Sequence, residues 1–211
     1  MPNVSSVKTK FFGAVDATDA DGISVSASIG SATTLTLGGT LTSGGSYTSG
    51  DNIGQIITIT SAADDSGITF TVVGTNAVGD ALTEVVTGAD TTVASSSGYF
   101  NTVTSITTSA ATAGAVTAGV LGSSTAGEMG TGTVFAGRTR IRGLQGLSGA
   151  SAGNLLFKNT SVTGTTLLTV PTQAAAELIE PYIPDNAVLF DAGAYVNFGS
   201  AVATITVFYD G

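Results

Sequence analysis

Residues 56–88, IITITSAADDSGITFTVVGTNAVGDALTEVVTG, decide the fold because strand-like runs and turn residues alternate along them. The run Ile56–Thr60 is β-branched throughout, which is typical of strands. After the first turn, apolar residues alternate with threonines, so Ile68, Phe70 and Val72 share one face of an extended segment. This period of two predicts half-buried strands rather than helices.

The stretch also contains a hairpin signal. Asn76–Asp80 gathers Asn, Gly and Asp, which favour turns, and Ala81–Gly88 then resumes a strand pattern. Further strands of the same kind are expected upstream around 23–29 and 33–41, and downstream at 99–107 and 114–120.

The second half of the chain repeats this alternation of strand-like runs and turn residues after a stretch rich in Gly, Ser and Thr. Expected strands lie at 133–147, 154–159, 165–170, 188–190, 194–198 and 203–209. The one helix candidate is Thr172–Glu180, ended by Pro181. Short strands at this spacing predict an all-β fold.

The domain organisation follows from these patterns. We expect an N-terminal arm at 1–12, a β-sandwich-like module at 13–122, a linker at 123–132 and a second β-sandwich-like module at 133–211. Each module is expected to be jelly-roll or Ig-like.

The composition argues against catalysis. The chain has no histidine, cysteine or tryptophan, and only 10% of it is charged. Histidine is the side chain most often used for proton transfer, and cysteine is both a nucleophile and a metal ligand. The sequence therefore predicts a protein that is not an enzyme and that needs no cofactor or metal.

Charge and hydropathy predict assembly. A formal charge of −9 works against binding nucleic acid, and no apolar run is long enough for a membrane-spanning helix. The N-terminus lacks a secretory-signal pattern, so we expect synthesis in a cytoplasm. So few charges cannot cover the surface of a lone domain, which favours a homo-oligomer, with a trimer preferred.

Two groups of short sequence motifs resemble those of small β-modules in tailed-phage virion proteins. The first half contains "ITS…DSGITFTVVGT", "YFNTVTSI" and "ATAGAV"; the second contains "RIRGL", "GTTLLTVPT", "IPDNAVLFDAGAYV" and "TVFY". The resemblance covers most of the chain and implies a structural component of the virion. Its modules bring no known catalytic residues.

Arg138, Arg140 and Arg142 hold half of the basic residues at a spacing of two, so one strand face is expected to carry three guanidinium groups. Guanidinium groups suit carboxylates, which favours docking on an acidic partner. The same pattern is equally typical of a solvated outer strand face.

The expected N-terminal arm offers a second candidate contact. Lys8 and Lys10 are the only bases in the first 130 residues, and Phe11 and Phe12 follow them as an apolar anchor. The interpretation is a tether that becomes ordered on a partner.

Three weaker patterns remain. Asp16–Gly22 partly matches a calcium loop but lacks the final Glu, and Asp64-Asp65 is ordinary turn chemistry. Aromatic residues near the C-terminus would suit a sugar platform, although they are more often core or interface: Tyr182, Tyr195, Phe198, Phe208 and Tyr209.

The sequence and the resemblance together predict a capsid decoration or cement protein in the virion. Its partner would be the major capsid protein or another virion protein. The alternatives are a tail, neck or fibre-attachment protein, or a carbohydrate-binding adhesin.

Overall fold

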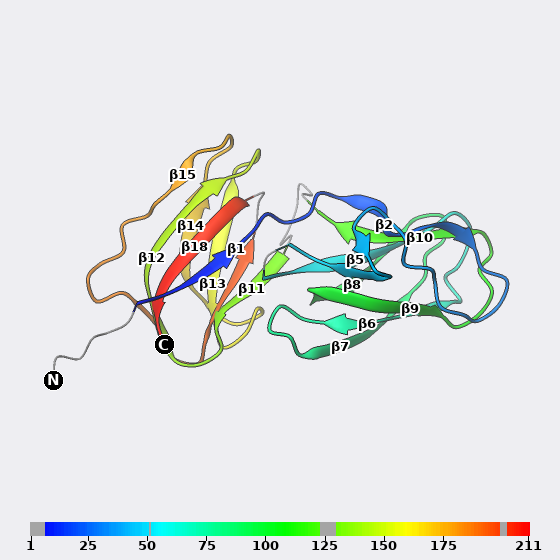
Figure 1. The fold of residues 1–211 in the computed structure, drawn as a ribbon, viewed down its shortest axis with the longest axis horizontal. Helices are drawn as coiled ribbons and strands as arrows, with labels where there is room; N and C mark the ends of the chain where they lie inside the picture. Colours follow the sequence, from blue (N-terminus) through cyan, green and yellow to red (C-terminus); the bar gives the residue numbers. More distant parts are fainter. Residues whose placement is uncertain (1–6, 51, 123–129, 199–201) are drawn as a thin grey trace. The chain divides into compact units, whose positions relative to one another are not determined.

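The computed structural model describes residues 7–50, 52–122, 130–198 and 202–211. Every regular element in these ranges is a β-strand, and the strands are numbered β1 to β18 (Figure 1). The all-β prediction is therefore confirmed. The candidate helix at 172–180 is wrong: Ala175 has a positive φ of 78°, which interrupts a helix, and Leu178–Ile179 forms strand β15.

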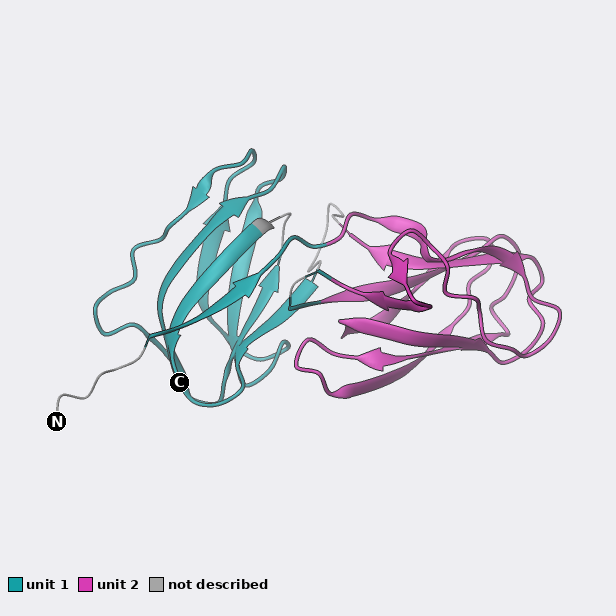
Figure 2. Cartoon of the chain, viewed as in Figure 1, with its two compact units in different colours: residues 1–15, 50–53, 125–211 teal, residues 16–49, 54–124 magenta. Residues whose placement is uncertain are grey.

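The strands divide into two compact units (Figure 2). Unit 1 takes the described parts of Met1–Val15, Gly50–Ile53 and Thr125–Gly211, and unit 2 takes Asp16–Ser49 and the described part of Gly54–Ser124. The chain therefore enters unit 1 first, builds unit 2 and returns to unit 1. The expected modules at 13–122 and 133–211 capture most of this division and miss the first entry.

Unit 2 is a sandwich of two antiparallel sheets. One sheet has the order β2-β10-β5-β8 and the other the order β3-β4-β9-β6-β7. The bounds are β2 Asp19–Ser28, β3 Thr42–Ser43, β4 Ser46–Thr48, β5 Ile53–Ser61, β6 Thr69–Thr75, β7 Ala81–Thr87, β8 Val93–Phe100, β9 Thr102–Thr108 and β10 Ala115–Leu121.

The core of unit 2 follows the period of two that the sequence predicts. Phe70 and Val72 are fully buried, and Ile68 packs against the same cluster. They meet Ile57 and Ile59 from the opposite sheet. The hairpin loop at 76–80 is also confirmed, with the Asn76 side-chain oxygen accepting the amides of two residues in the loop.

Two strand predictions in unit 2 are wrong in detail. The run 99–107 is broken at Asn101, where the chain passes from β8 in one sheet to β9 in the other. The Asn101 amide donates to Thr75 and its carbonyl accepts from Ser49, which fixes this crossing. Residues 33–41 form only an isolated bridge, Thr34 to Thr107, although Leu35 and Leu37 are buried.

Unit 1 is a second sandwich. Its first sheet has the order β1-β18-β12-β15, with β16 also paired to β12, and its second has the order β14-β13-β17-β11. The bounds are β1 Lys8–Phe12, β11 Gly130–Phe135, β12 Thr139–Ser148, β13 Gly153–Asn159, β14 Thr166–Thr172, β15 Leu178–Ile179, β16 Val188–Phe190, β17 Ala194–Phe198 and β18 Val202–Asp210.

Strand β1 overturns the prediction of an N-terminal arm for the residues that the structure describes. Lys8–Phe12 pairs antiparallel with β18 along its whole length. Phe12 is fully buried and contacts Phe198 edge to face, with the ring centroids 5.8 Å apart. These residues therefore form an edge strand of unit 1, and their partner strand lies about 200 residues further along the chain. Residues 1–6 of the expected arm lie outside the described residues.

The expected linker at 123–132 is also corrected at its end. Gly130, Thr131 and Gly132 belong to strand β11, which pairs with β17. A Cβ atom at position 132 would lie 2.3 Å from the Phe12 ring, so this position requires glycine. Residues 123–129 lie outside the described residues.

Candidate partner-binding surfaces

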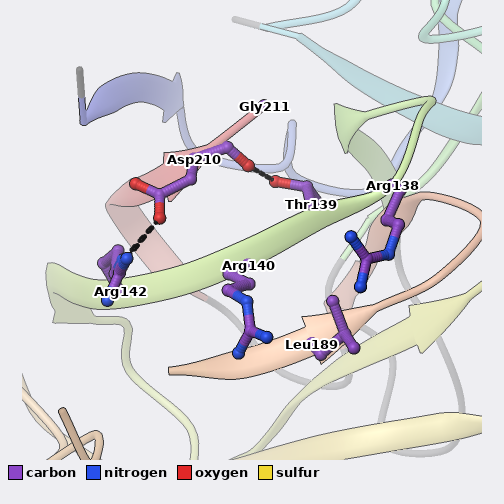
Figure 3. Close-up of a pocket in the computed structure, with 7 residues that line it drawn as sticks. All are labelled: Arg138, Thr139, Arg140, Arg142, Leu189, Asp210 and Gly211. Atoms are coloured by element: carbon purple, nitrogen blue, oxygen red, sulfur yellow. Dashed lines mark hydrogen bonds and ion pairs between the residues drawn. The ribbon is translucent and has the colours of Figure 1, made fainter. Parts of the chain in front are cut away.

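The three arginines lie together on the outer side of unit 1. Arg140 and Arg142 belong to β12, and Arg138 precedes it. Thr139 and Ile141 between them are buried, which agrees with the predicted alternation. The guanidinium groups line an open pocket of ≈ 300 Å³ that also includes Leu189, Asp210 and Gly211 (Figure 3).

Each arginine already has a partner within unit 1. Nε and Nη2 of Arg142 each lie 2.6 Å from Oδ2 of Asp210, and its Nη1 donates to the Asp185 carbonyl at 3.0 Å. Arg138 lies 3.5 Å from Asp191.

Arg140 differs from its two neighbours. Its Nη1 donates to the Asn186 carbonyl at 2.6 Å, and among the described residues it has no carboxylate partner. The arginines therefore fasten the segment before β16 and the end of β18 to β12. Arg142 is already paired with Asp210, whereas Arg138 and Arg140 have only an exposed carboxylate and a backbone carbonyl as partners. Docking of these arginines on an acidic partner stays a prediction.

The four candidate residues of the expected arm serve different purposes. The Lys8 ammonium donates to the Gly211 carbonyl and lies 5.7 Å from the centroid of the Phe135 ring. The Lys10 ammonium donates to the Asn52 side chain at 2.8 Å, and Asn52 in turn donates to the Phe11 carbonyl. Phe12 is core, so only Phe11 remains an exposed apolar contact.

The outer face of the β1-β18-β12-β15 sheet is a surface that the sequence did not predict. Strand register places Phe11 beside Thr206, and Leu147 beside Leu178. We call this surface the unit 1 sheet face; its exposed or half-buried members are Val7, Thr9, Phe11, Gln145, Leu147, Leu178, Thr206 and Phe208. The alternation of residues with a period of two predicts which side chains of each strand face outward. The pairing of β1 with β18 is long-range and leaves no signal in the neighbouring sequence.

The outer face of the β3-β4-β9-β6-β7 sheet in unit 2 is free of charge. Most of its side chains carry a hydroxyl and the others are aliphatic, so we call it the threonine face. Hydroxyl groups of neighbouring strands meet at 2.8 Å between Thr75 and Thr102 and at 3.1 Å between Thr34 and Thr107. Its members on the long strands are Thr69, Thr71, Val73, Thr75, Ala81, Thr83, Val85, Thr87, Thr102, Thr104, Ser105 and Thr107.

The carboxylates of the partial calcium loop do not converge. Asp16 accepts the Tyr47 hydroxyl at 2.9 Å, whereas Asp19 accepts the Thr40 hydroxyl at 2.7 Å, a bond that lowers the pKa of Asp19. Burial raises the pKa of Tyr47, with the Asp16 charge adding to it, so this hydroxyl stays protonated. Across the described ranges, no three Asp or Glu side chains are placed to hold a metal ion.

The Asp64-Asp65 pair divides into an exposed and a buried residue. The Ser66 hydroxyl and amide donate to Asp64 and lower its pKa. Asp65 is fully buried; one oxygen accepts the Ala113 amide at 2.7 Å, and the other has no hydrogen-bond partner. The Asp64 and Asp65 side chains therefore point in opposite directions, which agrees with the turn that the sequence predicts.

The aromatic residues near the C-terminus do not form a shared surface. Phe198 and Tyr209 belong to the unit 1 core, whereas Tyr182 is 86% exposed. A sugar platform built from the whole set is therefore wrong.

No protein-family model matches the chain, and neither a curated protein nor a solved structure matches it. Within the described residues, no helix has the length and apolar character needed to cross a membrane.

Proposed function

We propose that this chain is a non-enzymatic structural protein of a tailed-phage virion, acting as a decoration or cement protein on the capsid exterior. The observation that carries the proposal is the threonine face, a broad β-surface with hydroxyl and aliphatic groups and no charge. Covering an uncharged surface costs less desolvation free energy than covering a charged one, because no ion has to be removed from water. Such a face suits permanent contact with another protein.

The mechanism would be interfacial. Each copy would lie across neighbouring capsid subunits, with the threonine face against the major capsid protein or another virion protein. Homo-oligomeric contacts, as a trimer or around a symmetry axis, would link the copies. A standard interface buries roughly 1,600 Å² in total, so many repeated copies can strengthen a shell without strong single contacts.

The described cavities support a surface role rather than a chemical one. The pocket beside the arginines is open, and its charged groups are occupied by ion pairs and backbone carbonyls. Its side chains hold unit 1 together, which is a structural task.

The first test is the number of copies relative to the major capsid protein in purified particles, measured by quantitative mass spectrometry. A decoration protein is expected in a fixed ratio near that of the capsid subunit or its trimer. A few copies per particle would indicate a tail, neck or fibre position. Absence from particles would overturn the proposal.

A second test introduces charge into the threonine face. Thr83→Lys combined with Val85→Lys should weaken binding to undecorated particles by at least about tenfold, since each buried unpaired charge costs several kcal/mol. Ser26→Lys combined with Ser31→Lys adds the same charge at exposed positions of unit 2 outside this face. Equal binding of both variants would exclude the threonine face as the contact.

A further inference from the structure

Two edge strands of unit 2, β7 and β8, lie side by side although they belong to different sheets. Among the described strands, β7 pairs with β6 alone and β8 pairs with β5 alone. An open edge presents unpaired backbone N–H and C=O groups, so it can add a strand from another chain. Unit 2 therefore needs a feature that closes these two edges.

The carboxylate of Glu84 connects the two edge strands. Glu84 belongs to β7; its Oε1 accepts the Ser97 amide at 2.6 Å, and its Oε2 accepts the Gly98 amide at 2.8 Å. Both amides belong to β8. Hydrogen bonds to a charged acceptor are stronger than those between neutral groups. One side chain thus occupies two consecutive main-chain donors of an edge strand.

Strand β8 is bulged where the carboxylate binds, with the three residues Ser96 to Gly98 opposite the single residue Ile57 of β5. The Ser96 hydroxyl accepts the Ile57 amide and donates to the Gly98 carbonyl, both at 2.9 Å. These bonds hold the bulge in shape. The amides of Ser97 and Gly98 are therefore available to converge on Glu84.

Glycine at position 98 leaves room for the carboxylate. A Cβ atom there would lie 3.0 Å from Oε2 of Glu84 and 3.2 Å from the Leu82 side chain, closer than ordinary van der Waals contact. Leu82 packs against the core of unit 2, which restricts its movement. The glutamate, the bulge and the glycine therefore fit one another.

The position of Glu84 is unusual for a charged residue. Leu82 and Val86 share its side of β7, and both contact the unit 2 core, so an apolar residue would continue their pattern. Unit 2 contains no Lys or Arg that could pair with the half-buried carboxylate. An inward-pointing charge on an edge strand is one of the features by which natural sheets avoid strand addition.

We propose that Glu84 is an edge lock, an autoinhibitory contact that stops unit 2 from adding a strand of a second copy at β7 or β8. With the carboxylate in place, two donors of β8 are occupied and a charge opposes an incoming strand. Without it, both edges can extend their sheets by main-chain pairing. The lock belongs to unit 2 alone, so it operates whether or not the chain decorates a capsid.

The test uses variants of the full chain. Glu84→Gln keeps the shape of the side chain, but the nitrogen that replaces one oxygen donates and cannot accept an amide. Asp80→Asn is the matched control, since it removes the same charge at an exposed position next to β7. The double variant Glu84→Gln, Val85→Lys places a new charge on the same strand, at a residue that is 59% exposed.

The first measurement is amide hydrogen exchange by NMR. In Glu84→Gln, the Ser97 and Gly98 amides should exchange at least about tenfold faster, because they lose a charged acceptor. Amides of β6 should keep their exchange rates, which shows that the sandwich remains folded, and Asp80→Asn should leave all of these rates unchanged. Equal exchange of Ser97 and Gly98 in Glu84→Gln and the unmodified chain would exclude the lock.

The second measurement is mass by analytical ultracentrifugation over a concentration series. Glu84→Gln should self-associate at a concentration at least about tenfold lower than Asp80→Asn does, because β8 regains free donors. The double variant should return to the behaviour of Asp80→Asn, since a lysine on an edge strand opposes pairing. Folded Glu84→Gln that associates no more strongly than Asp80→Asn would overturn the proposal. A double variant that associates like Glu84→Gln would also overturn it, because the new contact would then lie away from β7.

Discussion

The two units are similar in architecture and differ in charge, since unit 2 is strongly acidic and unit 1 is nearly neutral. Both are sandwiches of antiparallel sheets with a separate apolar core. Unit 2 has eight acids and no base, whereas unit 1 has seven acids and all six bases. This separation is visible only when β1, with Lys8 and Lys10, is assigned to unit 1. The basic residues therefore gather in one folded unit although they lie in separate parts of the sequence.

The units also differ in how they use polar side chains. Unit 1 is fastened by arginine ion pairs and by arginine bonds to backbone carbonyls at its surface. Unit 2 has no base, so it relies on neutral donors, such as the Tyr47 hydroxyl and the Ser49 hydroxyl that both donate to buried Gln55. The units should therefore respond differently to mutation, salt and acid.

The largest effect is expected from truncating the core of one unit. Phe12→Ala should destabilise unit 1 by about 3–5 kcal/mol, because a fully buried aromatic ring is replaced by a cavity. Hydrogen exchange measured by mass spectrometry should rise in β18 and β12 and stay unchanged in β6 and β9. The matched variant Phe70→Ala in unit 2 should give the reverse pattern. Unchanged exchange in β18 after Phe12→Ala would mean that β1 is not part of the sandwich.

A smaller effect is expected within the polar network of unit 2. Tyr47→Phe removes a buried hydroxyl whose single hydrogen is shared between Asp16 and Gln55, so unit 2 should lose about 1–2 kcal/mol. The exposed Tyr182→Phe serves as a control and should leave stability unchanged. Chemical denaturation followed by tyrosine fluorescence measures both, and equal midpoints for the two variants would contradict a stabilising network.

Salt should shift the two units in opposite directions. Between about 0.02 and about 0.5 M NaCl, screening weakens the ion pairs of unit 1 and relieves repulsion among the acids of unit 2. The Tm of unit 1 should therefore fall slightly while that of unit 2 rises.

Arg142→Gln should lower the free energy of unfolding of unit 1 by about 1 kcal/mol or less and reduce its salt dependence, because the pair with Asp210 is partly exposed. Parallel shifts of both units would break the comparison.

Acid should produce the smallest difference. Hydrogen bonds from Ser66 lower the pKa of Asp64 below its ordinary value of 3.8. A lowered carboxyl pKa stabilises the fold at pH values above the ordinary pKa, and this contribution is lost as the pH falls through the lowered pKa. Ser66→Ala should therefore lower the Tm of unit 2 slightly at pH 6 and have a smaller effect at pH 2, where more of Asp64 is protonated. An equal effect at both pH values would show that the carboxylate charge is not involved.

Much of the fold is predictable from local sequence. The alternation at Ile68, Phe70 and Val72 and the loop at 76–80 depend on neighbouring residues, and both are confirmed. The same local signal misleads at 99–107, since the chain there changes sheets without changing its β character.

Long-range pairing explains what the sequence did not predict. Lys8–Phe12 has strand composition, but its partner β18 is distant, so the segment resembles a detached arm. The carboxylate of Glu84, which accepts the Ser97 and Gly98 amides at 2.6 and 2.8 Å, likewise has no local signal. Among the candidate sites, the arginine spacing predicts a common side, while their partners Asp185, Asp191 and Asp210 lie on other segments.

The pairing of β1 with β18 also sets an order of events during synthesis. Strand β1 leaves the ribosome first, and its partner follows about 200 residues later, which takes roughly 10–40 s at bacterial and eukaryotic translation speeds. Unit 2 is complete well before that moment, because all its strands lie between the two partners. Throughout this interval Phe11 and Phe12 have no sheet to join. A nascent chain stalled before β18 should therefore contain a finished acidic sandwich and an open N-terminal segment available to chaperones.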